Sequence, residues 1–397
     1  MKIISFVKPK CFIALLWVKN ITNNVKTMFT ANKSKTSLKG SAKHIIDPKF
    51  MLNRGPHIVA IGGGTGLSTM LRGLKRYTSN ITAVVTVADD GGGSGVLRKD
   101  LKILPPGDIR NCILALADTE PIMEQLLQYR FTKGMLKGQN FGNLFLAAMG
   151  GISENFEQAV KRMGDVLAVT GRVLPVTLED VRLRAQLADG SMIYGESQIG
   201  DRPPRGSQIR KVYIEPSKAK PCPDVIEAIY KADAIVLGPG SLYTSVIPNL
   251  LVEGIPDAIR KSKAVKIYVC NIMTQPGETE GYSVYDHVKA LEDHTYKGII
   301  DYCIVNSQPV PPHILPRYKR DGAQKVDFDA QRLVRTGIKP IYEELLFIRD
   351  NYVRHDYIKL AEVMLRIIAD NVLQGDKHRM MDYYYIKDIL KRQANGA

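Results

Sequence analysis

The sequence lacks paired cysteines and long apolar runs, and each absence excludes a class of protein. Its five cysteines are odd in number and form no C-x-x-C pair, so we expect neither a disulfide framework nor a thiolate zinc site. Reduced, mostly buried thiols are expected instead. The apolar run Cys11–Val18 is far shorter than the roughly 20 residues that a membrane-spanning helix requires. Together these absences favour a cytoplasmic protein without stable membrane insertion.

Acidic residues are nearly absent from the first 54 residues, and that segment carries most of the chain's positive charge. It holds eleven Lys or Arg and one acid, Asp47, a net of +10 out of +15 for the whole chain. Only about +5 is left for the other 343 residues, so no strongly basic globular domain remains for nucleic acid. We predict a flexible basic extension over residues 1–54. A weak amphipathic membrane contact through residues 11–18 stays open.

The dominant motif is a glycine turn between a predicted strand and a predicted helix. The β-branched run Ile58–Ile61 leads directly into Gly62-Gly63-Gly64-Thr65-Gly66, and apolar residues then recur at helical spacing from Leu67. Glycines let the backbone approach a ligand, and the free N–H groups of the first helical turn suit an anion. We therefore predict phosphate or nucleotide binding here. A purely structural turn is the alternative, because the dinucleotide and P-loop fingerprints are both incomplete.

Two adjacent carboxylates follow the second predicted strand, Ile81–Ala88. Asp89 and Asp90 precede Gly91 and Gly92, and our main hypothesis is that one carboxylate accepts hydrogen bonds from ribose hydroxyls. The alternatives are a metal held through substrate phosphates and a solvated loop. Further along, Asp108 is the predicted N-cap of a helix that follows two prolines.

Polar groups also precede an apolar helix near residue 145. Asn140 and Asn143 lie in a Gly-Gln-Asn-Phe-Gly-Asn segment, where either amide suits a helix cap. Both amides are equally suited to a base edge or a sugar hydroxyl, since each offers donors and an acceptor. The segment therefore predicts either capping or ligand contact.

A second glycine loop follows the predicted strand Ala234–Leu237. It contains Gly238, Gly240 and Ser241, and we expect the hydroxyls of Ser241, Thr244 and Ser245 to be in reach of phosphate or ribose. The next predicted strand, Val265–Cys270, is followed by the polar segment Asn271–Thr279. Because the carboxyl ends of parallel strands meet at one crevice, we expect these loops and the Asp89 loop to face a single ligand.

The C-terminal third offers a tyrosine and an arginine as candidate ligand contacts. Tyr318 follows a proline-rich passage, and Arg354 is a fork-shaped phosphate donor near the start of a helix. We interpret His355 as a surface or capping histidine and Asp356 as the N-cap of that helix, which begins near residue 357. Asp376 to Ala397 is basic and tyrosine-rich, and we predict a short helix or tail.

Strands alternate with helical patterns along the chain, which predicts an α/β fold. We expect a three-layer α/β/α, doubly wound, mostly parallel Rossmann-like sheet with a smaller β-rich insertion at about residues 165–215. The nucleotide-binding domain should span residues 55–373, with a tail over 374–397. Self-association stays open.

Five motifs in order resemble a known family. They are Ile61–Gly66, Val87–Gly92, Pro105–Asn111, Gly142–Leu144 and Gly238–Ser241. Together they resemble the YvcK-type gluconeogenesis factors, relatives of the CofD 2-phospho-lactate transferases, over about residues 56–373. Gln139 stands where the family usually has His, which argues against an acid–base role there. Gly93 replaces a usual Ser, and the long N-terminal extension is atypical.

The resemblance implies a cytoplasmic bacterial protein needed for normal cell shape and envelope growth on gluconeogenic carbon sources. It implies binding of nucleotide sugars of the UDP-N-acetylglucosamine kind, with no established catalysis and no cofactor assigned with certainty. Tyr318 and Arg354 correspond to the family's implicated Tyr and Arg.

Three functions follow from these patterns. The leading hypothesis is a nucleotide-sugar-binding regulatory factor, since phosphate-type loops occur without an assembled set of nucleophile, base and acid. The second is a CofD-like transferase acting on a phosphate ester with a nucleotide cosubstrate, and only there would Mg²⁺ be used. A nicotinamide oxidoreductase rests on the first glycine turn alone.

Overall fold

The computed structural model describes residues 52–201 and 206–373, together with Arg379, Asp382, Ile386 and Asp388. All of these belong to one compact unit, Asp47–Ala397. The predictions for residues 1–51 and for most of the C-terminal tail lie outside the described residues.

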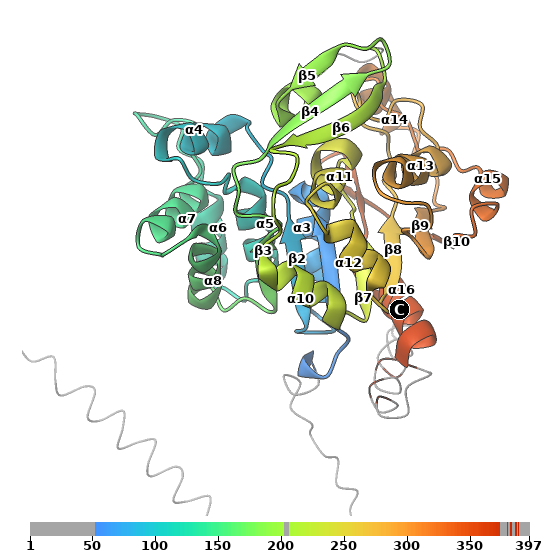
Figure 1. Ribbon diagram of the computed structural model, residues 1–397, viewed down its shortest axis with the longest axis horizontal. Helices are drawn as coiled ribbons and strands as arrows, with labels where there is room; N and C mark the ends of the chain where they lie inside the picture. Colours follow the sequence, from blue (N-terminus) through green and yellow to red (C-terminus); the bar gives the residue numbers. More distant parts are fainter. Residues whose placement is uncertain are drawn as a thin grey trace, which may run out of the picture. The chain divides into compact units, whose positions relative to one another are not determined.

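A seven-stranded sheet forms the middle of this unit (Figure 1), in the order β10-β9-β8-β7-β1-β2-β3. Its strands are β1 (Ile58–Gly62), β2 (Ile81–Val85), β3 (Arg172–Pro175), β7 (Ala234–Leu237), β8 (Val265–Val269), β9 (Tyr302–Asn306) and β10 (Lys339–Glu343). Every neighbouring pair is parallel. All residues of β1, β2, β7 and β9 are buried, as expected of parallel strands covered on both faces.

Helices cover both faces of this sheet, and alternate residues of β1 point into two different cores. Val59 and Ile61 face a core beneath α10 (Pro223–Lys231), α11 (Ile247–Leu250), α12 (Ile255–Lys261) and α13 (Val284–His294). Ile58 and Ala60 face a core beneath α3 (Gly64–Leu74), α5 (Gly107–Leu116) and α16 (Tyr357–Ile368). The predicted three-layer α/β/α fold with a mostly parallel sheet is therefore confirmed.

Two smaller antiparallel sheets accompany the main one. One has the order β5-β4-β6, with β4 (Arg182–Leu187), β5 (Met192–Tyr194) and β6 (Ile209–Glu215); the other pairs β11 (Leu346–Arg349) with β12 (Tyr352–His355). The segment predicted as an insertion also contains β3, which pairs with β2 at the edge of the main sheet. The smaller sheet itself begins only at Arg182.

The remaining helical elements complete the fold. They are α4 (Gly92–Leu101), α6 (Pro121–Gln128), α7 (Phe141–Gly151), α8 (Phe156–Val166), α9 (Glu196–Gly200), α14 (Leu315–Arg320), α15 (Ala330–Val334) and the π-helices η1 (Leu242–Val246) and η2 (Ala369–Leu373). Across the described residues, no helix combines the length and apolarity needed to cross a bilayer.

Of the two aspartates predicted as helix N-caps, Asp356 and Asp108, one caps its helix and the other does not. Asp356 caps α16 as predicted, accepting hydrogen bonds from the backbone N–H groups of Ile358 and Lys359. Asp108 is not the N-cap of α5. Pro106 occupies the N-cap position, and no side chain at that position makes a capping hydrogen bond. Asp108 lies inside the first turn instead, and its carboxylate faces the backbone N–H of Gly64.

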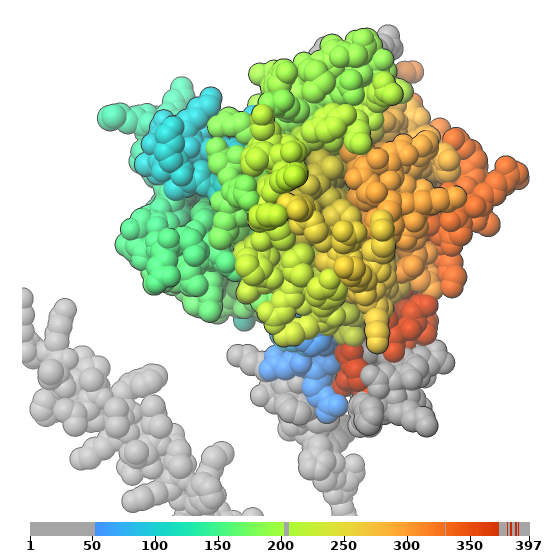
Figure 2. Space-filling model, viewed as in Figure 1, coloured from blue at the N-terminus to red at the C-terminus, as the bar shows by residue number. Residues whose placement is uncertain are grey.

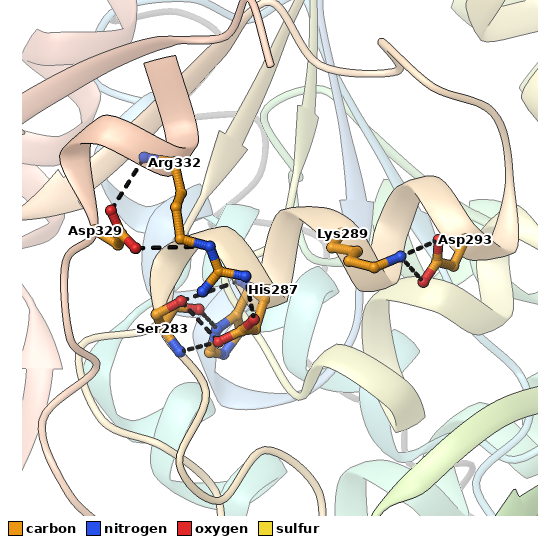
Figure 3. A network of polar contacts seen from close by, with 7 residues as sticks. Ser283, His287, Lys289, Asp293, Asp329 and Arg332 are labelled. Carbon is orange, nitrogen blue, oxygen red and sulfur yellow. Dashed lines mark hydrogen bonds and ion pairs between the residues drawn. The ribbon is translucent and has the colours of Figure 1, made fainter. Parts of the chain in front are cut away.

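The start of α13 is fixed by a reciprocal network (Figure 3). Ser283 accepts from the backbone N–H of Asp286, whose carboxylate accepts in turn from the Ser283 N–H. Arg332 of α15 reaches this carboxylate at 3.9 Å and that of Asp329 at 3.6 Å. Ser283 is therefore the N-cap of α13, and the contact between Arg332 and Asp286 ties α15 to this helix.

The four described cysteines, Cys112, Cys222, Cys270 and Cys303, are free and buried. This confirms the prediction of reduced, buried thiols for those positions. Cys11 lies outside the described residues.

Candidate functional site

A cavity of about 430 Å³ opens at the carboxyl ends of β1, β7 and β8. Its walls are the first glycine turn, the second glycine loop, the segment after β8, and a fourth wall from α14 and the β11–β12 hairpin. This volume is typical of sites for small molecules. Among the charged side chains that line it are Arg354 and Asp321.

The two glycine loops contact each other backbone to backbone. A Cβ added at Gly66 would lie 2.5 Å from the carbonyl oxygen of Pro239, and one at Gly240 would lie 3.2 Å from the carbonyl oxygen of Gly63. Gly64 has φ +66°, a conformation that favours glycine. Side chains are therefore excluded from the junction, and the two loops meet through their backbones.

The segment after β8 holds the second glycine loop in place. Asn271 Nδ2 donates to the carbonyl oxygen of Gly240 at 2.9 Å, and the Ser241 hydroxyl donates to Gln275 Oε1 at 2.6 Å. Both Asn271 and Gln275 line the cavity. Sequence analysis identified this segment but did not predict that it braces the second loop.

A buried carboxylate, Glu278, anchors the same loop from behind. Only 2% exposed, it accepts from Gln275 Nε2 at 2.6 Å, the Thr244 hydroxyl at 3.1 Å and the Tyr243 N–H at 3.2 Å. Thr244, expected to be in reach of a ligand, is therefore turned into this network. Ser245 does line the cavity. Nothing in the sequence spacing distinguished Glu278 from a surface acid.

The fourth wall presents Tyr318 and Arg354, the two residues singled out in the C-terminal third. Tyr318 Oη accepts the N–H of Val353 at 2.7 Å, which leaves the phenol proton free to donate into the cavity. The Arg354 side chain is exposed and makes one hydrogen bond, to the Val353 carbonyl oxygen at 3.1 Å. Its other donors are available to an anion.

His355 is not the surface or capping histidine that we expected. It lines the cavity, and its Nε2 lies 3.2 Å from the carbonyl oxygen of Cys270. Burial lowers the pKa of His355 to about 4, so the imidazole is neutral at physiological pH. It therefore adds no positive charge to the cavity.

The predicted site residues divide into three groups. Those that line the cavity are Gly63, Gly64, Thr65, Gly66, Gly240, Ser241, Tyr318 and Arg354. Gly62 and Gly238 lie just behind it, since a Cβ at Gly62 would be 3.8 Å from the Gly238 Cα. Asp89, Asp90, Gly91, Gly92, Asn140 and Asn143 are not among the lining residues.

Asn140 and Asn143 serve α7. Asn140 is its N-cap: Oδ1 accepts the N–H of Asn143 at 3.1 Å, and Nδ2 donates to the carbonyl oxygen of Gln128 at 3.0 Å. Asn143 is buried within the first turn of that helix. Capping was one of the two interpretations that the sequence left open, and neither residue lines the cavity.

Asp89 and Asp90 organise the loop after β2. Asp89 accepts the N–H of Gly91 at 2.9 Å, and Asp90 accepts the N–H of Ser197, in α9, at 2.9 Å. Asp90 therefore ties the main domain to the smaller sheet's helix. The loop lies behind the first glycine turn rather than in the cavity wall.

Carboxyl groups gather on that hidden side of the first turn. A Cβ at Gly63 would lie 2.6 Å from Asp108 Oδ2, so the Asp108 carboxyl packs directly against the turn. Burial raises the pKa of Asp108 to about 6; nearby Asp89 also raises it, while the Gly64 N–H and Arg110 oppose the shift. This carboxyl changes charge close to physiological pH.

Glu196 of α9 belongs to the same group, and sequence analysis missed it. Burial raises the pKa of Glu196 to about 8, and the carboxylates of Asp89, Glu278, Asp108 and Asp90 add to the shift. Glu196 is therefore mostly protonated at pH 7. Within the described part of the chain, no three His, Cys, Asp or Glu side chains are placed to share a metal ion.

Comparisons with known proteins agree with this architecture. The family described as "2-phospho-L-lactate transferase CofD" matches residues 58–346. The chain is 60% identical over 320 residues, 80% of this chain and 99% of the relative, to a protein named "Putative gluconeogenesis factor" from Thermoanaerobacterium thermosulfurigenes. It is 48% identical over 316 residues, 79% of this chain and 99% of the relative, to the "Gluconeogenesis factor" of Bacillus subtilis.

A solved structure supports the same assignment. The chain is 45% identical to a UPF0052 family member from Bacillus halodurans, whose crystal structure superposes with a TM-score of 0.75 over 78% of this chain and 99% of that one. The parallel sheet, the matched family and these relatives lead to one conclusion: the chain belongs to the CofD family and groups with its gluconeogenesis factors.

Proposed function

We propose that this chain is a cytoplasmic regulatory factor that binds a nucleotide sugar of the UDP-N-acetylglucosamine kind. Through this binding it would link gluconeogenic carbon supply to cell shape and envelope growth. The observation that carries the proposal is the backbone contact of the two glycine loops at one cavity, with Gly66 against Pro239.

The cavity walls match the parts of such a ligand. The amides of the first turn of α3 and of the second loop suit the diphosphate, because helix N-termini and glycine turns direct N–H groups at anions. Arg354 adds a guanidinium fork, and Tyr318 adds a hydroxyl donor. Asp321, exposed at the lining, suits the hydroxyl groups of a sugar.

The lining favours binding over catalysis. His355 is neutral and directed at a backbone carbonyl, and Ser241 donates its proton to Gln275. Among the described lining residues, no hydroxyl or thiol is hydrogen-bonded to a histidine or carboxylate that would activate it. A regulatory receptor needs only the affinity that such a lining supplies.

Isothermal titration tests the proposal with UDP-N-acetylglucosamine, UDP-glucose, GDP and a nicotinamide dinucleotide as ligands. We expect heat with the UDP-sugars, and about tenfold to a hundredfold weaker binding in Arg354→Gln, since a charge-assisted contact is lost. Arg349→Gln is the matched control, because Arg349 is exposed on the same hairpin but does not line the cavity. No heat with any UDP-sugar at millimolar concentration would overturn the proposal.

A second candidate function is a CofD-like transferase acting on a phosphate ester with a nucleotide cosubstrate. It is favoured by the matched family and by two carboxyls, Asp108 and Glu196, whose pKa values lie near neutrality. The described carboxylates do not form a three-ligand metal set, so no step is assigned to Mg²⁺. Phosphoryl or phospholactyl transfer that is lost in Asp90→Asn would place this candidate first.

A further inference from the structure

The loop between α6 and α7, residues 129–140, carries apolar side chains on its exposed surface; we call it the projecting loop. Met135 is fully exposed, and Tyr129 and Leu136 are 49% and 44% exposed. In Figure 2 this part of the chain stands out from the body of the molecule at the left of the view, beside α4. Large apolar side chains held in solvent in this way mark an interaction surface.

The loop is held in one shape by its own backbone. Phe131 donates to the Gln139 carbonyl oxygen at 2.9 Å and accepts from the Gly138 N–H at 2.8 Å, and Phe141 donates to the Tyr129 carbonyl oxygen at 2.8 Å. Arg130 Nη1 also donates to the Gly138 carbonyl oxygen at 2.6 Å. These bonds close the loop across its base, so Met135 and Leu136 are fixed at its tip.

Cations surround this tip. Arg130, Lys133 and Lys137 are exposed within the loop, which contains no acid. The neighbouring helix α4 contacts the loop, since a Cβ at Gly93 would lie 3.2 Å from Gln139 Oε1. Helix α4 and its C-cap residue add further exposed side chains to this surface, namely Val96, Lys99, Asp100, Leu101 and Lys102. The surface therefore combines apolar groups with a clear excess of positive charge.

The shape and composition of this surface identify its partner. Protein interfaces are depleted of lysine and need a complementary groove, whereas this surface is a convex tip flanked by lysines. Nucleic acid matches the charge, but its phosphate backbone gains nothing from Met135 and Leu136 unless these side chains wedge between base steps. An anionic bilayer matches both features, because its headgroups attract Lys and its interfacial region accepts apolar side chains.

We propose that the projecting loop binds the surface of an anionic lipid bilayer, with Met135 and Leu136 entering the interface and Lys133 and Lys137 among the headgroups. The contact is peripheral and reversible, since a few side chains do not anchor a protein permanently. It is independent of the ligand cavity, whose lining includes no residue of the loop.

Vesicle co-sedimentation of the full chain tests the proposal, with vesicles of phosphatidylcholine alone or mixed with 30% phosphatidylglycerol. The full chain should bind the mixed vesicles and not the neutral ones. The double variant Lys133→Gln/Lys137→Gln should bind about 25-fold more weakly, at roughly fivefold for each lysine. Met135→Ser/Leu136→Ser should bind about tenfold more weakly.

Matched controls separate the loop from the rest of the chain, including the basic N-terminal segment that every variant keeps. Lys261→Gln/Lys263→Gln removes two exposed lysines near α12, and Val334→Ser removes an exposed apolar side chain of α15. Both should bind like the original protein. Loop variants that bind as tightly as these controls, or a full chain that ignores anionic vesicles, would overturn the proposal.

Discussion

The first glycine turn has two sides with opposite electrostatic character. Toward the cavity it faces hydroxyls, amides and the guanidinium of Arg354. On its hidden side it packs against Asp108, with Asp89 and Glu196 close behind. A few residues of backbone therefore separate the cavity from a group of half-buried acids.

This difference shows how a glycine turn can bind an anion conditionally. The Gly64 N–H that the sequence offers to a phosphate faces the Asp108 carboxylate. A charged Asp108 lowers the potential that a phosphate meets, whereas a protonated Asp108 does not. If the turn binds a phosphate as proposed, we expect the affinity to depend on the protonation of Asp108.

The largest expected effect comes from Glu278, which holds the second glycine loop against the first turn's cavity from behind. Glu278→Ala should destabilise the protein by about 4 kcal/mol, because three buried donors lose their acceptor. Glu278→Gln, which keeps an acceptor oxygen, should lose less than half as much. Urea unfolding measures both, and a loss below about 1 kcal/mol for the alanine variant would contradict the network.

The second largest expected effect is a gain in stability when Glu196 is replaced. The pKa of Glu196 is raised from 4.5 to about 8 in the folded chain, so stability from its bound proton is complete below pH 4.5 and is lost as the pH rises through 8. Glu196→Gln should therefore raise stability by about 3 kcal/mol at pH 8 and leave it unchanged at pH 4. Thermal melting across this range checks it. The exposed Glu154→Gln is the control.

Breaking the contact between the loops should have a smaller effect on stability. Gly66→Ala places a methyl group against the Pro239 carbonyl and should cost about 2 kcal/mol, together with most of the UDP-sugar affinity. Gly150→Ala, in α7 with open space around the new methyl group, should be neutral or stabilising by up to about 1 kcal/mol. Equal melting temperatures for the two variants would argue against tight apposition.

The smallest expected effect concerns the protonation of Asp108, and it tests most directly how the two sides of the first glycine turn differ. Because the pKa of Asp108 is raised to about 6, a bound phosphate should raise it further, and binding near pH 7 should take up a proton. Titration in two buffers of different ionisation enthalpy measures this uptake. Asp108→Asn should abolish it and gain about 1–2 kcal/mol of stability at pH 7. The exposed Asp100→Asn is the control.

Local features of the fold could be predicted because they depend on nearby residues. The apolar strands, the two glycine turns and the caps at Asn140, Ser283 and Asp356 each follow from a few neighbouring side chains. Asp108 and His355 were misjudged because their partners, Gly64 and Cys270, are far away in the chain. Glu196 gave no signal for the same reason.

The sequence by itself determined a parallel α/β sheet with glycine turns at the ends of β1 and β7, since hydrophobic period and glycine placement are local properties. Only the tertiary structure decided that Tyr318 and Arg354 share a cavity with those turns while Asp89 and Asp90 lie behind them. The reason is geometric: strand order and loop direction place residues on one side of a backbone turn or the other. That placement then decides which side chains are buried and which charges lie near the cavity.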